Sequence, residues 1–165
     1  MKTALALSQT ELAFEPPPRR GPRPRSCRTL PYLQLDQWPP EAIVEELVSQ
    51  CLDFPNVRAR QSRMASPESR ALSLPDAFAA GPANAFIDGH EFCHLHPPPD
   101  GSIHLTLPKD LRERAVHQAW AEQHPVVRVG VMPETLVMVY APRSSDELGI
   151  VLKLVWGSYQ FAAGL

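Results

Sequence analysis

Four of the six histidines in this chain lie within fifteen residues of one another, at positions 90, 94, 96 and 104. Histidine is the side chain that most readily acts as a base, an acid or a metal ligand near neutral pH. The segment 97–101 (Pro-Pro-Pro-Asp-Gly) separates the last two and has the composition of a turn. The spacing therefore predicts a histidine-rich β-hairpin, and this hairpin is the first place to look for function.

The two faces of such a hairpin follow from strand geometry, because successive side chains point to opposite faces. One face then carries the histidines: His90, Phe92, His94 and His96 on the first strand, with Ser102, His104 and Thr106 on the second. With 97–101 as the loop, His94 lies opposite His104, with Cβ atoms about 4.5–5.5 Å apart. The other face carries Glu91 and an apolar layer that pairs Cys93 with Leu105 and Leu95 with Ile103. That apolar layer is suited to cover by helices.

The order of the remaining elements indicates an α+β domain. Apolar periodicity predicts a helix over 41–52, strands over 57–64 and 70–74, a helix over 109–121 and a strand over 135–140. Ser144-Ser145-Asp146-Glu147 has the pattern of a capping box, which predicts a last helix. Consecutive strands favour a single antiparallel sheet of about four to five strands, with helices packed mainly on one face and the histidine-rich hairpin on the other.

The first 37 residues differ in composition from the rest. Residues 16–28 are rich in proline and arginine and cannot form a helix or a central strand. We therefore expect residues 1–37 to be a largely extended N-terminal segment and residues 38–165 to be the folded domain. Solvated arginines on a polyproline-type tail are a simpler interpretation than a basic arm for a binding partner.

Charge and composition exclude several classes of protein. The formal net charge of −2 gives no field that would favour nucleic acid. No apolar run approaches the roughly 20 residues of a membrane span, and polar residues 8–11 interrupt the short apolar start too early for a signal peptide. Three cysteines without metal-type spacing favour reduced thiols and a cytoplasmic location. The oligomeric state stays open.

The histidines could instead hold a metal ion. His94, His96 and His104, with His124 as a further candidate, would suit zinc, iron or copper. Strand alternation turns Glu91 away from this face, so no carboxylate joins them there. We therefore expect a metal-free polar pocket, and a histidine-bound ion is the alternative.

From about residue 86 to 161 the chain resembles the luciferase-domain family, which includes the fungal luciferases that act on 3-hydroxyhispidin. The resemblance rests on four motifs in the same order: Glu91 with His94-Leu95-His96, the strand Ser102–Leu107, Trp120 followed by His124-Pro125, and Tyr140-Ala141-Pro142-Arg143. The chain departs from the family at Ala119 and Ala121, where the family has glycine, and in the stretch 126–134. It also has the Pro/Arg-rich segment where the fungal enzymes have a membrane segment.

The resemblance implies oxygen chemistry without flavin or nicotinamide. A small enolic substrate such as a hydroxypyrone would lose a proton, react with O2, lose CO2 and leave a ring-opened keto acid. The catalytic candidates are His94, His96, His104 and His124, which would act as base and as oxyanion donors. The substrate-binding candidates are Glu91, Phe92, Trp120, Tyr140 and Arg143. Glu91 could orient a histidine or be a strand-edge carboxylate, and Arg143 could bind an anion or tie down its turn.

A non-enzymatic module is the second interpretation. The same pocket would then hold a small molecule or a metal ion without turnover, and the Pro/Arg-rich tail would contact a partner. Sequence alone leaves open whether the protein is an enzyme.

Overall fold

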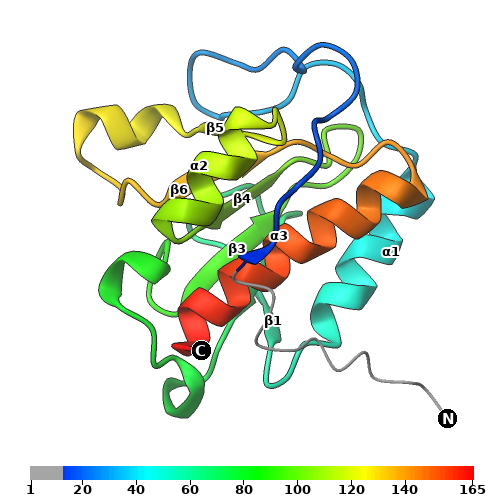
Figure 1. The fold of residues 1–165 in the computed structure, drawn as a ribbon. Coiled ribbons are helices and arrows are strands. Elements are labelled where there is room, and N and C mark those ends of the chain that lie inside the picture. Colours follow the sequence, from blue (N-terminus) through cyan, green and yellow to red (C-terminus); the bar gives the residue numbers. More distant parts are fainter. Residues whose placement is uncertain (1–12) are drawn as a thin grey trace, which may run out of the picture.

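The computed structural model describes residues 13–165 (Figure 1). The helices are α1 (Glu41–Leu52), α2 (Lys109–His117) and α3 (Ser145–Ala163), and three short 3-10 helices span Asp76–Phe78, Ala83–Ala85 and Pro125–Val129. The strands are β1 (Arg58–Gln61), β2 (Arg70–Ser73), β3 (Glu91–Leu95), β4 (Ile103–Thr106), β5 (Ala121–Gln123) and β6 (Leu136–Val139). The α+β prediction is confirmed.

All the strands belong to one antiparallel sheet in the order β1-β2-β3-β4-β6-β5. The sheet has six strands, one more than the upper end of the expected range. The additional strand is β5, which pairs with β6 where the second helix was expected to continue to residue 121. The helix ends at His117 because Ala119 takes a left-handed conformation with φ of 65°. That turn sends the chain back along the sheet edge.

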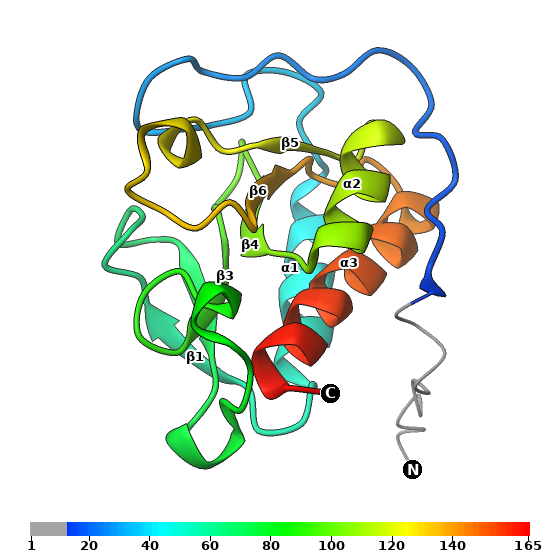
Figure 2. The same ribbon diagram turned by 60° about the vertical axis from the view of Figure 1, so that its left-hand side comes forward.

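The long helix α3 packs against β3 and β4, and α1 packs beside α3 (Figures 1 and 2). The main hydrophobic core fills the space between these helices and the sheet. It includes the apolar side of the hairpin, where Cys93 pairs with Leu105 and Leu95 with Ile103 as expected. The helices therefore cover one face of the central strands, and the histidines lie on the opposite face.

The capping box before α3 is confirmed in part. Ser144 is the N-cap, and its hydroxyl accepts a hydrogen bond from the Glu147 backbone N–H at 3.3 Å. The Glu147 carboxylate, however, accepts from the backbone N–H of Arg143 at 2.8 Å rather than from that of Ser144. The return bond of the motif is thus shifted one residue toward the N-terminus.

The described part of the N-terminal segment, residues 13–37, is largely extended, but it is not a solvated tail; residues 1–12 lie outside the described residues. Figure 2 shows it running past α2 and β5. The Arg19 side chain is buried, and the Arg23 guanidinium donates to the Ala121 carbonyl at 3.0 Å. The Arg25 side chain is exposed and pairs with Asp36. The expectation of solvated arginines therefore holds for Arg25 and is wrong for Arg19, and the domain boundary at residue 38 stays a prediction.

None of the helices within residues 13–165 is both long enough and apolar enough to span a membrane.

Candidate functional site

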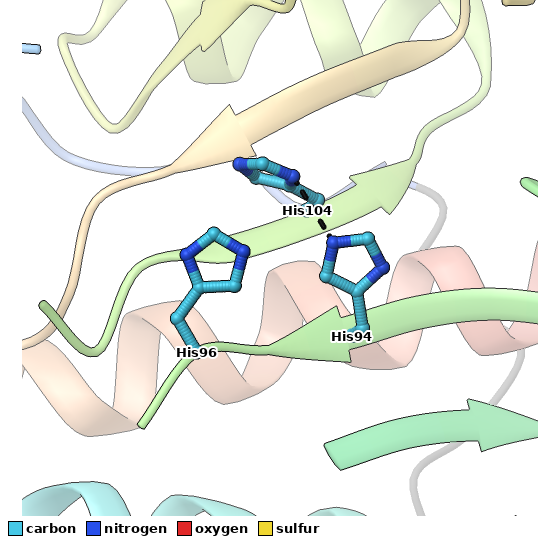
Figure 3. Close-up of side chains that lie close together, drawn as sticks. All are labelled: His94, His96 and His104. Carbon is cyan, nitrogen blue, oxygen red and sulfur yellow. Dashed lines mark hydrogen bonds between the residues drawn. The ribbon is translucent and has the colours of Figure 1, made fainter. Parts of the chain in front are cut away.

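The hairpin has the predicted register. His94 lies opposite His104 in the ladder between β3 and β4, and the His96 backbone N–H donates to the Ser102 carbonyl at 3.0 Å. The imidazoles of His94, His96 and His104 come together on the side of the sheet away from α3 (Figure 3). Their ring centroids are 4.5–5.4 Å apart.

A register shift in β3 changes the facing of Glu91 and Phe92, the two residues before Cys93. Leu72 of β2 pairs with Cys93, but the next residue, Ser73, pairs with Glu91. Phe92 is therefore an extra residue in β3, and such a bulge reverses the facing of the residues before it. Phe92 lies in the main core against Tyr159 and not in a pocket with the histidines. Glu91 lies on the histidine side, so the prediction that it faces away is wrong.

Each of two histidines is held by a buried carboxylate. Glu91 Oε1 lies 2.7 Å from His94 Nδ1, and Asp100 Oδ2 lies 2.5 Å from His96 Nδ1. An ionised carboxylate only accepts hydrogen bonds, so both Nδ1 atoms carry the proton. The Nε2 atoms of the two rings therefore present lone pairs to the interior of the cluster. Of the two roles left open for Glu91, the geometry supports the carboxylate that orients a histidine and not the strand-edge carboxylate.

His104 completes the chain of contacts. Its Nδ1 lies 3.1 Å from His94 Nε2. Because that Nε2 carries a lone pair, His104 must donate from Nδ1, which leaves a lone pair on its own Nε2. This Nε2 is buried and makes no hydrogen bond within the described part of the chain. A buried polar atom without a partner costs free energy, so it marks a place where the fold is incomplete without a ligand or serves chemistry.

His124 joins the cluster from the segment after β5. Its ring meets that of His104 edge-on, with centroids 4.7 Å apart. His124 Nδ1 accepts from the Val126 backbone N–H at 3.4 Å, so its proton is on Nε2. The cluster therefore combines lone pairs from three rings with one N–H donor from the fourth.

Burial lowers the pKa of three histidines of the cluster and so favours their neutral form. Burial lowers the pKa of His94, and the effect exceeds the opposing influence of Glu91. Burial is the largest cause that lowers the pKa of His104 well below its usual value, and the neighbouring histidines come next. A backbone hydrogen bond with Tyr32 raises this pKa, but its effect is the smallest of all. The same two causes lower the pKa of His124 to about 4. At neutral pH these rings can act as bases or as ligands.

Tyr32 covers the cluster and was missed by sequence reasoning. Its ring lies edge-on to His124 at a centroid distance of 4.8 Å, and it lies 6.0 Å from His104. Its hydroxyl donates to Glu122, which also accepts from the Tyr140 hydroxyl at 2.8 Å. Burial, and then the bond to Glu122, raises the pKa of Tyr32. Burial is also the largest cause that raises the pKa of Tyr140, to about 12.

Tyr32 lies in a loop closed by the isolated antiparallel bridge between Ser26 and Gln34, which we call the Tyr32 hairpin. This hairpin is anchored at Gln34. Its backbone N–H donates to Asp100, the carboxylate that also holds His96, at 2.9 Å. Its side-chain oxygen accepts from the Ala141 backbone N–H at 2.9 Å. The cover over the cluster is thus tied both to the loop between β3 and β4 and to the chain just after β6.

Trp120 and Arg143 lie outside the cluster. The Trp120 ring belongs to the main core, and its Nε1–H donates to the Pro17 carbonyl at 2.6 Å. Arg143 pairs with Glu147 and also donates to the Arg20 carbonyl at 2.9 Å. Arg143 therefore ties down its turn and the N-terminal segment, and neither residue is placed to contact a ligand at the histidines.

The cluster is closed to solvent. Relative exposure is 2% for His94, 6% for His96, and 5% for both His104 and His124. Asp100 and Glu91 are similarly buried. Because all four rings are buried, a substrate can reach them only when part of the surrounding chain moves.

The fold and this site define a small α+β domain that buries a cluster of four histidines between a sheet and an N-terminal cover. Residues 89–158 match the family model of the luciferase domain. The chain is 29% identical over 161 residues to a protein named luciferase from Armillaria gallica, and 28% identical to luciferases from Armillaria ostoyae and Armillaria mellea. The region that carries the histidine cluster is therefore similar to the luciferase domain.

Each alignment covers 86% of this chain and 59% of the relative, so the chain spans about three fifths of the length of these proteins. No solved structure matches the chain significantly.

Proposed function

We propose that this protein is a luciferase-like oxygenase that acts on a small enolic or aromatic molecule of the hydroxypyrone type with O2, without flavin or nicotinamide. The observation that carries the proposal is the orphaned lone pair on His104 Nε2, inside a buried histidine cluster where burial lowers the pKa of His104. The similarity to proteins named luciferase supports the class of reaction. A cytoplasmic location and the lack of a nucleic-acid partner stay predictions.

The base of this reaction is assigned to His104. In the metal-free protein the series Glu91–His94–His104 fixes the tautomers so that the lone pair is on the His104 nitrogen without a partner. A base must take the enol proton before the carbon can react with O2. The proton that arrives at His104 Nε2 is stabilised through His94 by the buried carboxylate of Glu91.

The donor is assigned to His124. Its Nε2–H belongs to a ring that contacts both His104 and Tyr32. A fixed N–H donor can stabilise the negative charge that develops on oxygen as the peroxide forms. The two imidazoles thus divide the roles of base and oxyanion donor.

The position of the phenol ring of Tyr32 indicates that a planar, hydroxylated substrate would fit beside the cluster. It lies against His124 and places its hydroxyl on the Glu122 carboxylate. A planar hydroxylated ring would fit the same position after the Tyr32 hairpin swings away, and Glu122 and Tyr140 would hold its hydroxyl. Movement of a covering segment to admit a substrate is common in enzymes.

An oxygen-electrode screen with a panel of hydroxypyrones tests the proposal. The wild-type protein should consume O2 with at least one member of the panel, and His104→Gln should lower the rate by at least about 100-fold, in the range expected for loss of a general base. The matched control is His117→Gln, on the exposed surface of α2, which should leave the rate unchanged. Full turnover in His104→Gln, or no oxygen uptake by the wild type with any hydroxypyrone, would refute the proposal.

A binding module is the second candidate, and the closure of the cluster favours it. In that case the same hydroxypyrones would raise the melting temperature by mass action without any uptake of O2. The Pro/Arg-rich segment would then serve interaction with a partner.

A further inference from the structure

The imidazoles of His94, His96 and His104 form a group that we call the trio. Each offers one ring nitrogen, and the three nitrogens all lie within 4.8 Å of one another. A tetrahedral ion with metal–nitrogen bonds of about 2.0–2.1 Å holds its ligand atoms about 3.3–3.4 Å apart. The pair that is already in contact, His94 Nε2 and His104 Nδ1, is 3.1 Å apart, close to that spacing.

The hydrogen bonds around the trio turn ring nitrogens toward its centre. Glu91 and Asp100 fix the protons of His94 and His96 on Nδ1 and turn both Nε2 lone pairs inward. A carboxylate on the outer nitrogen of a ligating histidine is the usual second partner in protein metal sites, where it sets the tautomer and strengthens the ligand. His104 would ligate through Nδ1, and its proton would then lie on Nε2, the nitrogen that makes no hydrogen bond within the described residues.

The charges around the trio also lack a counterpart. Glu91 and Asp100 are 7% and 8% exposed, and within residues 13–165 neither forms an ion pair with lysine or arginine. Buried carboxylates are normally paired with a cation or bind a metal. Two carboxylates at the outer edge of three imidazoles match one divalent ion at the centre.

We propose that the trio binds one divalent transition-metal ion of the zinc, iron or copper class, with Glu91 and Asp100 as the carboxylates that orient two of its ligands. Three imidazoles without a thiolate or a direct carboxylate suit these ions. Three protein ligands leave a further coordination position open, which is the pattern of a catalytic and not of a structural site. His124 and Tyr32 lie beside His104, next to the trio.

This proposal rests on the geometry of the trio and does not depend on the luciferase-like reaction. The two meet at one point: an ion in the trio would lower the pKa of an enol bound to it, and the lone pair of His104 would no longer be needed as the base. Metal binding is measured without a substrate, so either proposal can fail alone.

The test is a titration of tag-free, chelator-treated protein with Co²⁺ followed by visible absorption, and with Zn²⁺ followed by calorimetry. The proposal predicts one equivalent of each ion per chain and an absorption spectrum typical of four- or five-coordinate Co²⁺. His96→Gln and His104→Gln should each abolish stoichiometric binding. Glu91→Gln should weaken binding by about 10–100-fold, because it removes the carboxylate behind His94 and leaves all three ligands.

The control is His117→Gln, which should bind both ions like the wild type. Circular dichroism shows whether each variant is folded. If either His96→Gln or His104→Gln does not fold, the other still tests the proposal. The proposal is overturned if folded wild-type protein takes up no stoichiometric Co²⁺ or Zn²⁺. It is equally overturned if binding survives in His96→Gln and His104→Gln, or if His117→Gln abolishes it.

Discussion

Replacement of Glu91 by glutamine isolates the carboxylate that orders the cluster. Glu91 Oε1 accepts hydrogen bonds from His94 at 2.7 Å and from the Ser62 hydroxyl at 2.9 Å. A hydrogen bond to a charged group contributes about 1.5–3 kcal/mol and a neutral one about 0.5–1.5 kcal/mol, so two weakened bonds cost about 2–3 kcal/mol. Relief from burying a charge offsets part of that loss. We therefore expect a net decrease of about 1–2 kcal/mol in the free energy of unfolding.

Urea denaturation of metal-free wild type and Glu91→Gln measures this difference directly. For a domain of this size it corresponds to a fall in melting temperature of about 2–8 °C. Glu68→Gln is the matched control, because Glu68 is exposed, and it should change stability by less than about 0.5 kcal/mol. Nitrogen NMR of the wild type should also show His94 as the Nδ1–H tautomer. An unchanged unfolding free energy in Glu91→Gln, or an Nε2–H tautomer of His94, would refute the reasoning.

Three further predictions concern residues around the site. Tyr32→Phe keeps the covering ring but removes the hydroxyl bound to Glu122, so urea denaturation should show a loss of about 1 kcal/mol, and equal stability would contradict that contact. Phe92→Ala should cost about 3–5 kcal/mol because Phe92 packs in the core, and a cost below about 1 kcal/mol would place it in a pocket after all. Burial opposes ionisation of Glu147, but its bonds to Arg143 outweigh this and lower its pKa. Glu147 therefore stabilises the fold above its unfolded pKa of about 4.3, and this contribution is lost as the pH falls through the folded pKa. Glu147→Gln should accordingly flatten the acid-side loss of unfolding free energy, measured by denaturation between about pH 5 and pH 3.

The local pattern of the sequence was sufficient for the hairpin. Turn residues at 97–101 fixed which residues face each other, because register in a hairpin follows from the loop. The pairing of His94 with His104 was therefore predictable from residue types and spacing alone. The helix over 41–52 followed equally from its apolar periodicity and matches α1.

The bulge in β3 was not predictable from alternation. Alternation assumes that every residue has one partner, and the extra residue at Phe92 breaks that assumption. One insertion exchanged the faces of Phe92 and Glu91 and so removed one predicted pocket residue and added the orienting carboxylate. Strand β5 was missed for a related reason, because the left-handed Ala119 carries no glycine or asparagine signal.

The long-range partners were beyond reach of any local pattern. Tyr32 lies in a segment whose proline and arginine content indicates an extended chain, and nothing in that composition says where the chain docks. Asp100 belongs to a turn, where aspartate is common for purely local reasons. Both contacts depend on the folded arrangement, in which Gln34 joins the Tyr32 hairpin to Asp100.

The central claim is that the buried histidine cluster is the reaction site of a luciferase-like oxygenase. The most direct test is O2 uptake by wild-type, His104→Gln and His117→Gln proteins with the hydroxypyrone that the wild type turns over fastest. The account predicts that His104→Gln loses at least about 100-fold in rate while His117→Gln keeps the wild-type rate. Equal rates in all three proteins would contradict it, because the chemistry would then lie elsewhere in the molecule.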